Sequence, residues 1–151
     1  MSTLFSAAGP DLTAAQLYAV LRLRCDVFVV EQECAYPEVD GRDLLPGTRH
    51  LWISGDDSDG ADGVDAYLRV LAEPGGIGRI GRVVTAKSAR GRGLAGELMA
   101  AALDGATGEF VLDAQTYAQG LYARFGFVAE GEEFLDDGIP HITMRRPAEA
   151  G

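Results

Sequence analysis

The sequence predicts one mixed α/β domain whose central sheet has about six or seven strands and is flanked by helices. Two observations carry this prediction. Segments with the alternating pattern of strands are interleaved with segments that repeat at the helical spacing, and turn residues separate them. The length of 151 residues, with 47% hydrophobic residues, suits a single core over residues 1–151.

The composition restricts the class of protein. Thirteen Lys and Arg against 23 Asp and Glu give a formal net charge of −10, which disfavours nucleic acid and anionic membranes as partners. No apolar run reaches the ~20 residues of a membrane span and no secretory signal is recognisable, so we expect a cytoplasmic protein. Cys25 and Cys34 have no metal-ligand spacing, and we expect free thiols and no metal. A homodimer is left open.

The first half of the chain is expected to form one helix followed by antiparallel strands. Thr13 and Gln16 form a capping box, so a helix should run from there to about Val30. Residues 33–48 contain proline, glycine and acidic residues and are expected to form a long loop. Strands are expected over residues 50–54, 64–71 and 77–85, and residues 55–63 should form a solvated hairpin loop rather than a calcium loop.

The second half is expected to return to the sheet through a crossover helix. That helix should cover residues 94–107, with Gly108 as its stop. A strand over 110–112, a short helix over 118–124, and strands over 127–129 and 141–144 should follow. The strand, helix, strand unit from 80 to 112 requires a parallel pair at the centre of an otherwise antiparallel sheet. The acidic residues 132, 133, 136 and 137 are expected to form a solvated hairpin.

A glycine-rich turn precedes the crossover helix and has three interpretations. Residues 91–96 match G-x-G-x-x-G, with Asp113 further on, so an NAD(P)-binding domain is one alternative. Residues 85–90 separate the strand from the first glycine, which disfavours that fingerprint. The same turn suits a pyrophosphate held by backbone N–H groups at a helix N-terminus, with Arg90 and Arg92 adding positive charge. A basic loop without a ligand is the third interpretation.

Two motifs resemble those of a known family. Arg90-x-x-Gly93-x-Ala95 resembles the acyl-CoA pyrophosphate motif of the GNAT superfamily of N-acyltransferases. Residues 115–127 resemble its later motif, although Gln115 stands where Asn is usual. Residues 17–18, 24–32, 36–50 and 138–142 resemble the ElaA-type branch, so the likeness covers nearly the whole chain.

The resemblance implies an enzyme that transfers an acetyl group from acetyl-CoA to a primary amine, a small molecule or a peptide, by direct attack in a ternary complex. It implies that the thioester lies beside the backbone of Val83 and Val84, and that Tyr122 protonates the departing thiolate. The cofactor-binding residues that it implies are Val83, Val84, Arg90, Gly91, Arg92, Gly93, Leu94, Ala95, Gly96 and Gln115. A non-catalytic acyl-CoA sensor or scaffold is the alternative function.

The general base is left open by the sequence. Glu31 lies seven residues after Arg24 on one predicted helical face, and burial beside Arg24 would keep it ionised. We expect Glu31 to orient the amine or to accept its proton; the alternative is a helix end in solvent, or a pair with Arg24. The residues expected to contact the acceptor are Arg24, Asp40, His50 and His141.

Overall fold

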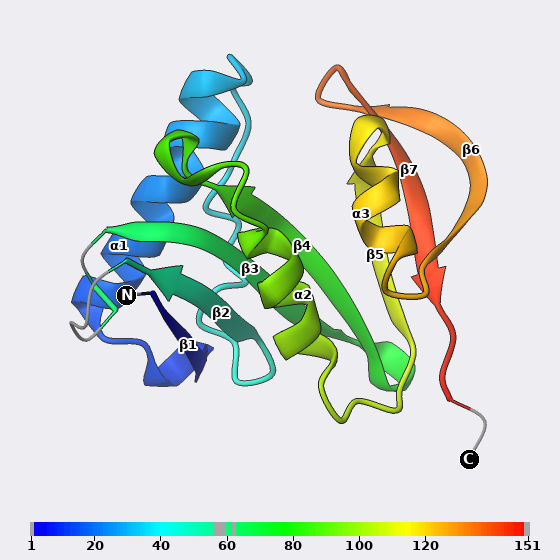
Figure 1. Ribbon diagram of the computed structural model, residues 1–151, viewed down its shortest axis with the longest axis horizontal. Coiled ribbons are helices and arrows are strands. Elements are labelled where there is room, and N and C mark those ends of the chain that lie inside the picture. The colour runs from blue at the N-terminus through cyan, green and yellow to red at the C-terminus, as the bar shows by residue number, and fades with distance from the viewer. Residues whose placement is uncertain (1, 56–59, 62, 150–151) are drawn as a thin grey trace.

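The chain forms one mixed sheet in the computed structural model, which describes residues 2–55, 60–61 and 63–149. Within these residues seven strands lie in the order β1-β2-β3-β4-β5-β7-β6 (Figure 1). Their bounds are β1 Thr3–Ala8, β2 Arg49–Ser54, β3 Val64–Glu73, β4 Ile77–Thr85, β5 Phe110–Gln115, β6 Val128–Asp136 and β7 Ile139–Arg146. The longer helices are α1 Ala14–Arg24, η2 Cys25–Glu31, α2 Leu94–Leu103 and α3 Gln119–Ala123. The predicted fold class is confirmed.

The first helix begins as predicted and then changes its pitch. Thr13 accepts a hydrogen bond from the Gln16 N–H at 3.0 Å, and the Gln16 side chain accepts one from the Thr13 N–H at 3.0 Å. After Arg24 the chain continues as the π-helix η2 instead of the predicted α-helix. The wider turn of a π-helix shifts the direction of every later side chain. Arg24 is fully buried whereas Glu31 is exposed, so the prediction that they share one face was wrong.

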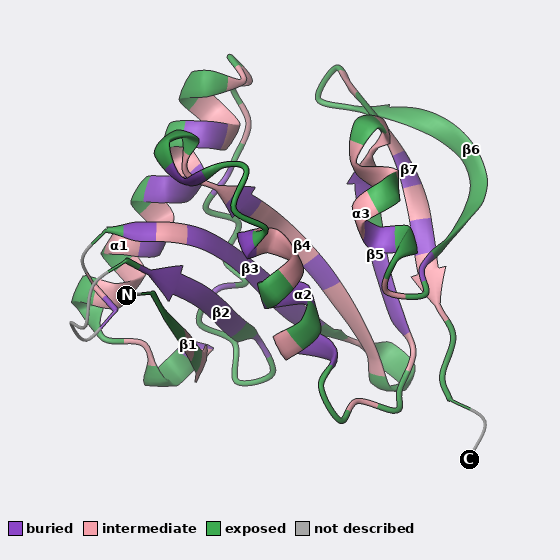
Figure 2. Ribbon diagram, viewed as in Figure 1, coloured by how far each residue is buried: buried purple, intermediate pink, exposed green. Residues whose placement is uncertain are grey.

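Helices cover both faces of the sheet. On one face α2 and α3 pack on a core that includes Leu68, Ile80, Leu98, Leu112 and Met144. On the other face α1 and η2 pack on a smaller core around Trp52, Tyr67 and Val84. Figure 2 shows that β2 and β3 are buried, whereas β6 is exposed along its whole length at the sheet edge.

Several predicted boundaries in the second half move. α2 ends at Leu103 because Gly105, with φ +70°, takes the left-handed conformation that was assigned to Gly108. β5 and β6 extend further than predicted, and the acidic residues 132, 133 and 136 lie on β6. The short helix divides into a 3-10 turn, Thr116–Ala118, and α3. The loop predicted over 55–63 contains residues 56–59 and 62, which lie outside the described residues.

The parallel pair at the centre of the sheet is joined only at one end. β4 and β5 pair at Gly78 with Phe110 and at Arg79 with Val111. A Cβ on Gly78 would approach the Phe110 ring to 2.8 Å, so glycine permits the close contact there. No other pair joins the two strands within the described residues, and Figure 1 shows their far halves apart. The central pair therefore splays toward the carboxyl ends of both strands.

Candidate active site

A cavity of about 670 Å³ opens where β4 and β5 part. Its walls come from η2, the segment 32–42, β4, β5, α3 and the β6–β7 hairpin. The predicted site residues that line it are Glu31, Asp40, Val83, Val84, Arg90, Ala95, Gln115, Tyr122 and His141. The structure thus brings together residues that are far apart in the sequence.

The glycine-rich turn leads into α2 at one end of this cavity. Gly93 is the N-cap of α2 with φ +73°, a conformation that L side chains rarely adopt. A Cβ at Gly91 or Gly93 would meet no described atom within 4 Å. The backbone N–H groups of the first turn lack intrahelical partners, so the turn has the space and the donors that an anion needs.

Other predicted members of the turn lie differently. Leu94 is buried in the core under α2. Arg92 lies 3.9 Å from Asp65 and donates to Ser2 at 3.3 Å. A Cβ at Gly96 would lie 3.9 Å from the Arg124 side chain, so no close packing of helix on strand requires this glycine. The dinucleotide fingerprint requires that close packing and a direct passage from strand to glycine turn. Gly96 lacks the first, and residues 86–90 separate β4 from Gly91, so the fingerprint does not apply.

Glu31 contacts the cofactor side of the cavity rather than Arg24. Its two carboxylate oxygens accept hydrogen bonds from Arg90 Nη1 at 2.7 Å and Nη2 at 2.9 Å, and Arg90 Nε donates to the Thr85 carbonyl at 3.2 Å. The Arg90 hydrogen bonds and charge hold the pKa of Glu31 below its ordinary value. Glu31 is ionised, as expected, but its partner is Arg90, and a carboxylate so engaged is a weak proton acceptor.

Tyr122 is held as a protonated phenol. Its side chain is 7% exposed, packs edge-on against Phe127 with ring centroids 6.4 Å apart, and lines the cavity. Burial, with a smaller effect from Tyr117, raises the pKa of Tyr122 to about 12. The hydroxyl makes no hydrogen bond to any residue that the structure describes. Its proton is therefore available to a group inside the cavity.

A β-bulge shapes the β4 wall of the cavity. Tyr67 pairs with Val84 and Arg69 with Gly81, so β4 carries one residue more than β3 between these pairs. Arg82 lies in this bulge with φ +53°, a costly conformation for a residue with a side chain. Bulges bend a strand and redirect its side chains and N–H groups. Val83 and Val84, which follow directly, both line the cavity.

Six charged side chains form a cluster that fixes the loop 33–48 to the sheet. The buried ion cluster consists of four buried side chains, Arg24, Glu38, Asp43 and Arg69, and of the more exposed Asp40 and Arg82 at its edge. Glu38 is only 3% exposed and accepts from Arg24 Nε at 2.7 Å and from Arg82 Nε at 2.8 Å, and Tyr36 also donates to it. Asp43 accepts from Arg24 at 2.6 Å and from Arg69 at 3.0 Å. The cluster connects α1, the loop, β3 and the β4 bulge.

This cluster changes the roles predicted for two acceptor residues. Arg24 is fully buried, its guanidinium lies over the Tyr67 ring, and it does not line the cavity. His50 is fully buried, with Nδ1 2.6 Å from the Tyr67 hydroxyl and Nε2 2.8 Å from the Asp43 carbonyl, and it also lies outside the cavity lining. Both hold the loop in place, and we remove them from the acceptor site.

Asp40 and His141 remain on the cavity wall. Burial alone would raise the pKa of Asp40, but hydrogen bonds from Arg69 and from the Arg42 N–H, with the charges of Arg69 and Arg82, hold it well below the usual range. His141 Nδ1 lies 2.7 Å from the Ile139 carbonyl, and its ring stacks on Phe134. The predicted site did not include Glu38, Arg69 or Arg82. Arg69 had one available signal, because it stands among apolar residues of a predicted buried strand.

The fold and the cleft define the class, and the comparisons with known proteins agree. Residues 62–147 match the acetyltransferase (GNAT) domain, and the chain belongs to this family. It is 49% identical over 142 residues to the UPF0039 protein Rv2851c of Mycobacterium tuberculosis, with 91% of this chain and 88% of the relative covered. Protein ElaA of Escherichia coli is 39% identical over 145 residues, with 90% of each covered.

Solved structures give the same result. The crystal structure of an acyl-CoA N-acyltransferase from Pseudomonas aeruginosa superposes with a TM-score of 0.86 at 45% identity, covering 97% of this chain and 99% of that one. The chain thus belongs to the GNAT family of acyl-CoA N-acyltransferases, and the family implies an acyl-CoA co-substrate. Among the described residues no helix is long and apolar enough to cross a membrane. Within the same residues no group of three His, Cys, Asp or Glu is placed to hold a metal ion.

Proposed function

We propose that this protein is an N-acetyltransferase that moves an acetyl group from acetyl-CoA to a primary amine by direct attack in a ternary complex. One observation carries the proposal: the cavity begins at the glycine-rich turn, passes between the splayed strands, and is lined by residues from both faces of the sheet. Tyr122 belongs to the α2–α3 side, whereas Asp40 and Arg69 belong to the α1 side. Two substrates can therefore approach one point from opposite faces.

The residues present fit acetyl-CoA at the α2–α3 side. The open turn at Gly91 and Gly93 and the N-terminus of α2 would hold the pyrophosphate, because N–H donors and the helix dipole favour an anion there. The unpaired edges of β4 and β5 offer backbone groups to the pantetheine amides. The acetyl thioester supplies the electrophilic carbon, and the rest of the chemistry depends on this chain.

A group on the cavity wall is available for each chemical step of the transfer. N–H groups near Val83 and Val84 would stabilise the negative charge that develops on the carbonyl oxygen when the amine attacks. The nitrogen–carbon bond forms and the carbon–sulfur bond breaks. Tyr122 gives its proton to the leaving sulfur, since burial keeps the phenol protonated at neutral pH. The acidic surface favours the approach of a cationic amine.

The test measures release of free CoA from acetyl-CoA with amino acids, polyamines, aminoglycosides and peptide N-termini as acceptors. Tyr122→Phe keeps the ring and removes the proton, so we expect kcat to fall by ~10²–10⁴ with little change in acetyl-CoA affinity. A variant within about twofold of the parent, under conditions where chemistry limits the rate, would remove Tyr122 as the acid. Stabilisation by acetyl-CoA without any CoA release would favour the sensor or scaffold alternative.

The remaining expectations about partners stay predictions. They concern a small-molecule or peptide amine as acceptor, no nucleic-acid or membrane partner, and a cytoplasmic location. Homodimer formation stays open. Mass measurement in solution and fractionation of cells would test them independently of the activity.

A further inference from the structure

We infer that His141 is the general base that takes the proton from the attacking amine, and that its Nε2 is the accepting atom. This inference rests on the proposed function and extends it to the residue that the sequence left unassigned. It starts from one hydrogen bond. His141 Nδ1 lies 2.7 Å from the carbonyl oxygen of Ile139, and a carbonyl oxygen can only accept. Nδ1 therefore carries the hydrogen.

The tautomer leaves a lone pair on Nε2 of a side chain that lines the cavity. In a neutral imidazole with Nδ1–H, the other nitrogen, Nε2, is an acceptor. No described residue donates to His141 Nε2, and the side chain lines the cavity. Phe134, whose ring centroid is 6.0 Å from that of His141 at an angle of 25°, fixes the plane of the imidazole. The imidazole ring and the lone pair on Nε2 are therefore oriented before a substrate binds.

The sheet places His141 on the face opposite Tyr122. His141 pairs with Gln115 of β5, and directly opposed residues of antiparallel strands project to the same face. Leu112 and Ala114 of β5 project into the core under α2 and α3, so Gln115 and His141 project to the other face. Tyr122 packs in the α2–α3 core. The acid and the base therefore line one cavity from opposite faces of the sheet.

Four other candidate bases, Glu31, Asp40, His50 and Asp113, are engaged. Glu31 holds Arg90 through both oxygens, and Asp40 holds Arg69. His50 uses both ring nitrogens inside the protein. Asp113 accepts from Thr143 at 2.8 Å. None of these offers an unoccupied basic atom to the cavity.

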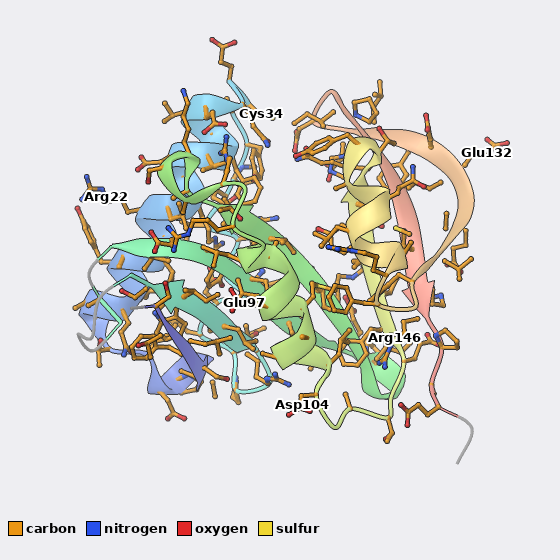
Figure 3. The ribbon with its side chains drawn as sticks, viewed as in Figure 1. Arg22, Cys34, Glu97, Asp104, Glu132 and Arg146 are labelled. Atoms are coloured by element: carbon orange, nitrogen blue, oxygen red, sulfur yellow. The ribbon has the colours of Figure 1, made fainter. Side chains whose placement is uncertain are left out.

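The surroundings of His141 suit a cationic amine. Asp136 and Asp137 line the cavity at the β6–β7 turn, where Asp137, with φ +49°, and Gly138, with φ +80°, form a tight hairpin. The Cys34 thiol donates to the Asp137 carbonyl at 3.4 Å, and Figure 3 labels Cys34 near this hairpin. Gln115 of β5 and Phe134 of β6 pair with His141, and Cys34, Asp113, Asp136 and Asp137 line the same cavity.

The proton balance closes with these two residues. A cationic amine first loses one proton to water. The neutral amine then forms its bond to the acetyl carbon and gives one proton to His141 Nε2, while Tyr122 gives one proton to the departing sulfur. Water then takes the proton from the imidazolium and returns one to the phenolate. The products are an amide and a thiol, with no oxidant or reductant.

The first test reads the tautomers directly by ¹⁵N NMR of the imidazoles. The chain has two histidines, and the structure assigns them opposite neutral forms. His141 should carry its hydrogen on Nδ1, and His50 on Nε2, which donates to the Asp43 carbonyl while Nδ1 accepts from Tyr67. His141→Gln assigns the signals. A His141 with its hydrogen on Nε2 overturns the inference whatever the activity.

The second test uses an amine that the parent enzyme acetylates. His141→Gln should lower kcat/KM for the amine by ~10²-fold or more, spare acetyl-CoA affinity, and change the shape of the pH profile. Added imidazole should partly restore His141→Ala. His50→Gln is the matched control, and its pH profile should match that of the parent enzyme. Parent-like activity and pH profile in His141→Gln overturn the inference, whereas a parent that acetylates no amine overturns the proposed function itself.

Discussion

The buried ion cluster gives a quantitative prediction about Glu38. Glu38→Gln keeps the shape of the side chain but removes the charge that faces Arg24 and Arg82. Removing one partner of a buried ion pair costs about 3–5 kcal/mol because the remaining charge stays uncompensated. An isosteric amide still accepts one hydrogen bond, so we expect a loss near the lower end, about 3 kcal/mol. That corresponds to a fall in Tm of roughly 6–12 °C.

Urea unfolding followed by the fluorescence of Trp52 measures this loss. The chain has a single Trp, and it is 1% exposed, so its emission reports on the core under α1. Glu73→Gln is the matched control, because Glu73 also pairs with an arginine, Arg79, at 2.7 Å, but both side chains are partly exposed. Exposed pairs contribute about 0–1 kcal/mol. Equal losses in the two variants would refute the reasoning that burial makes the cluster costly to break.

Three further predictions concern the turn, Glu31 and pH. Gly93→Ala should weaken acetyl-CoA binding in calorimetry, whereas Gly75→Ala, which also changes a glycine with positive φ but lies in the turn between β3 and β4, should leave binding unchanged; equal affinities would remove the glycine-rich turn from the site. Glu31→Gln should tighten acetyl-CoA binding by about three- to tenfold at low salt, because Arg90 is released and a competing negative charge is lost; weaker binding would contradict this. Ion pairs outweigh burial and hold the pKa of Asp43 below its usual value, so its stabilisation is present above about pH 4 and is lost as pH falls further. Acid unfolding should accordingly be less steep in Asp43→Asn, and an unchanged slope would contradict the assignment.

Glu31 shows the limit of predicting side-chain contacts from helical spacing. Its spacing from Arg24 is correct for one face of an α-helix, but η2 is a π-helix and its wider turn places Glu31 against Arg90. The local sequence does not predict the change from α-helix to π-helix, because the packing of η2 against the sheet decides it. The expected role in the acceptor site is therefore replaced by a contact on the cofactor side.

The sequence by itself determined the features that depend on local chemistry. The capping box at Thr13, the glycine turn before α2 and the order of strands and helices after β1 follow from short-range steric and hydrogen-bonding rules, whereas β1 itself was not predicted. The splay between β4 and β5, the burial of His50 and the free Nε2 of His141 were decided only by the tertiary structure. A histidine's role depends on which groups reach its two nitrogens, and for His50 those groups come from other strands and loops. These groups come together only when distant segments pair in the fold, so a pattern within one segment cannot predict their contacts with the histidine.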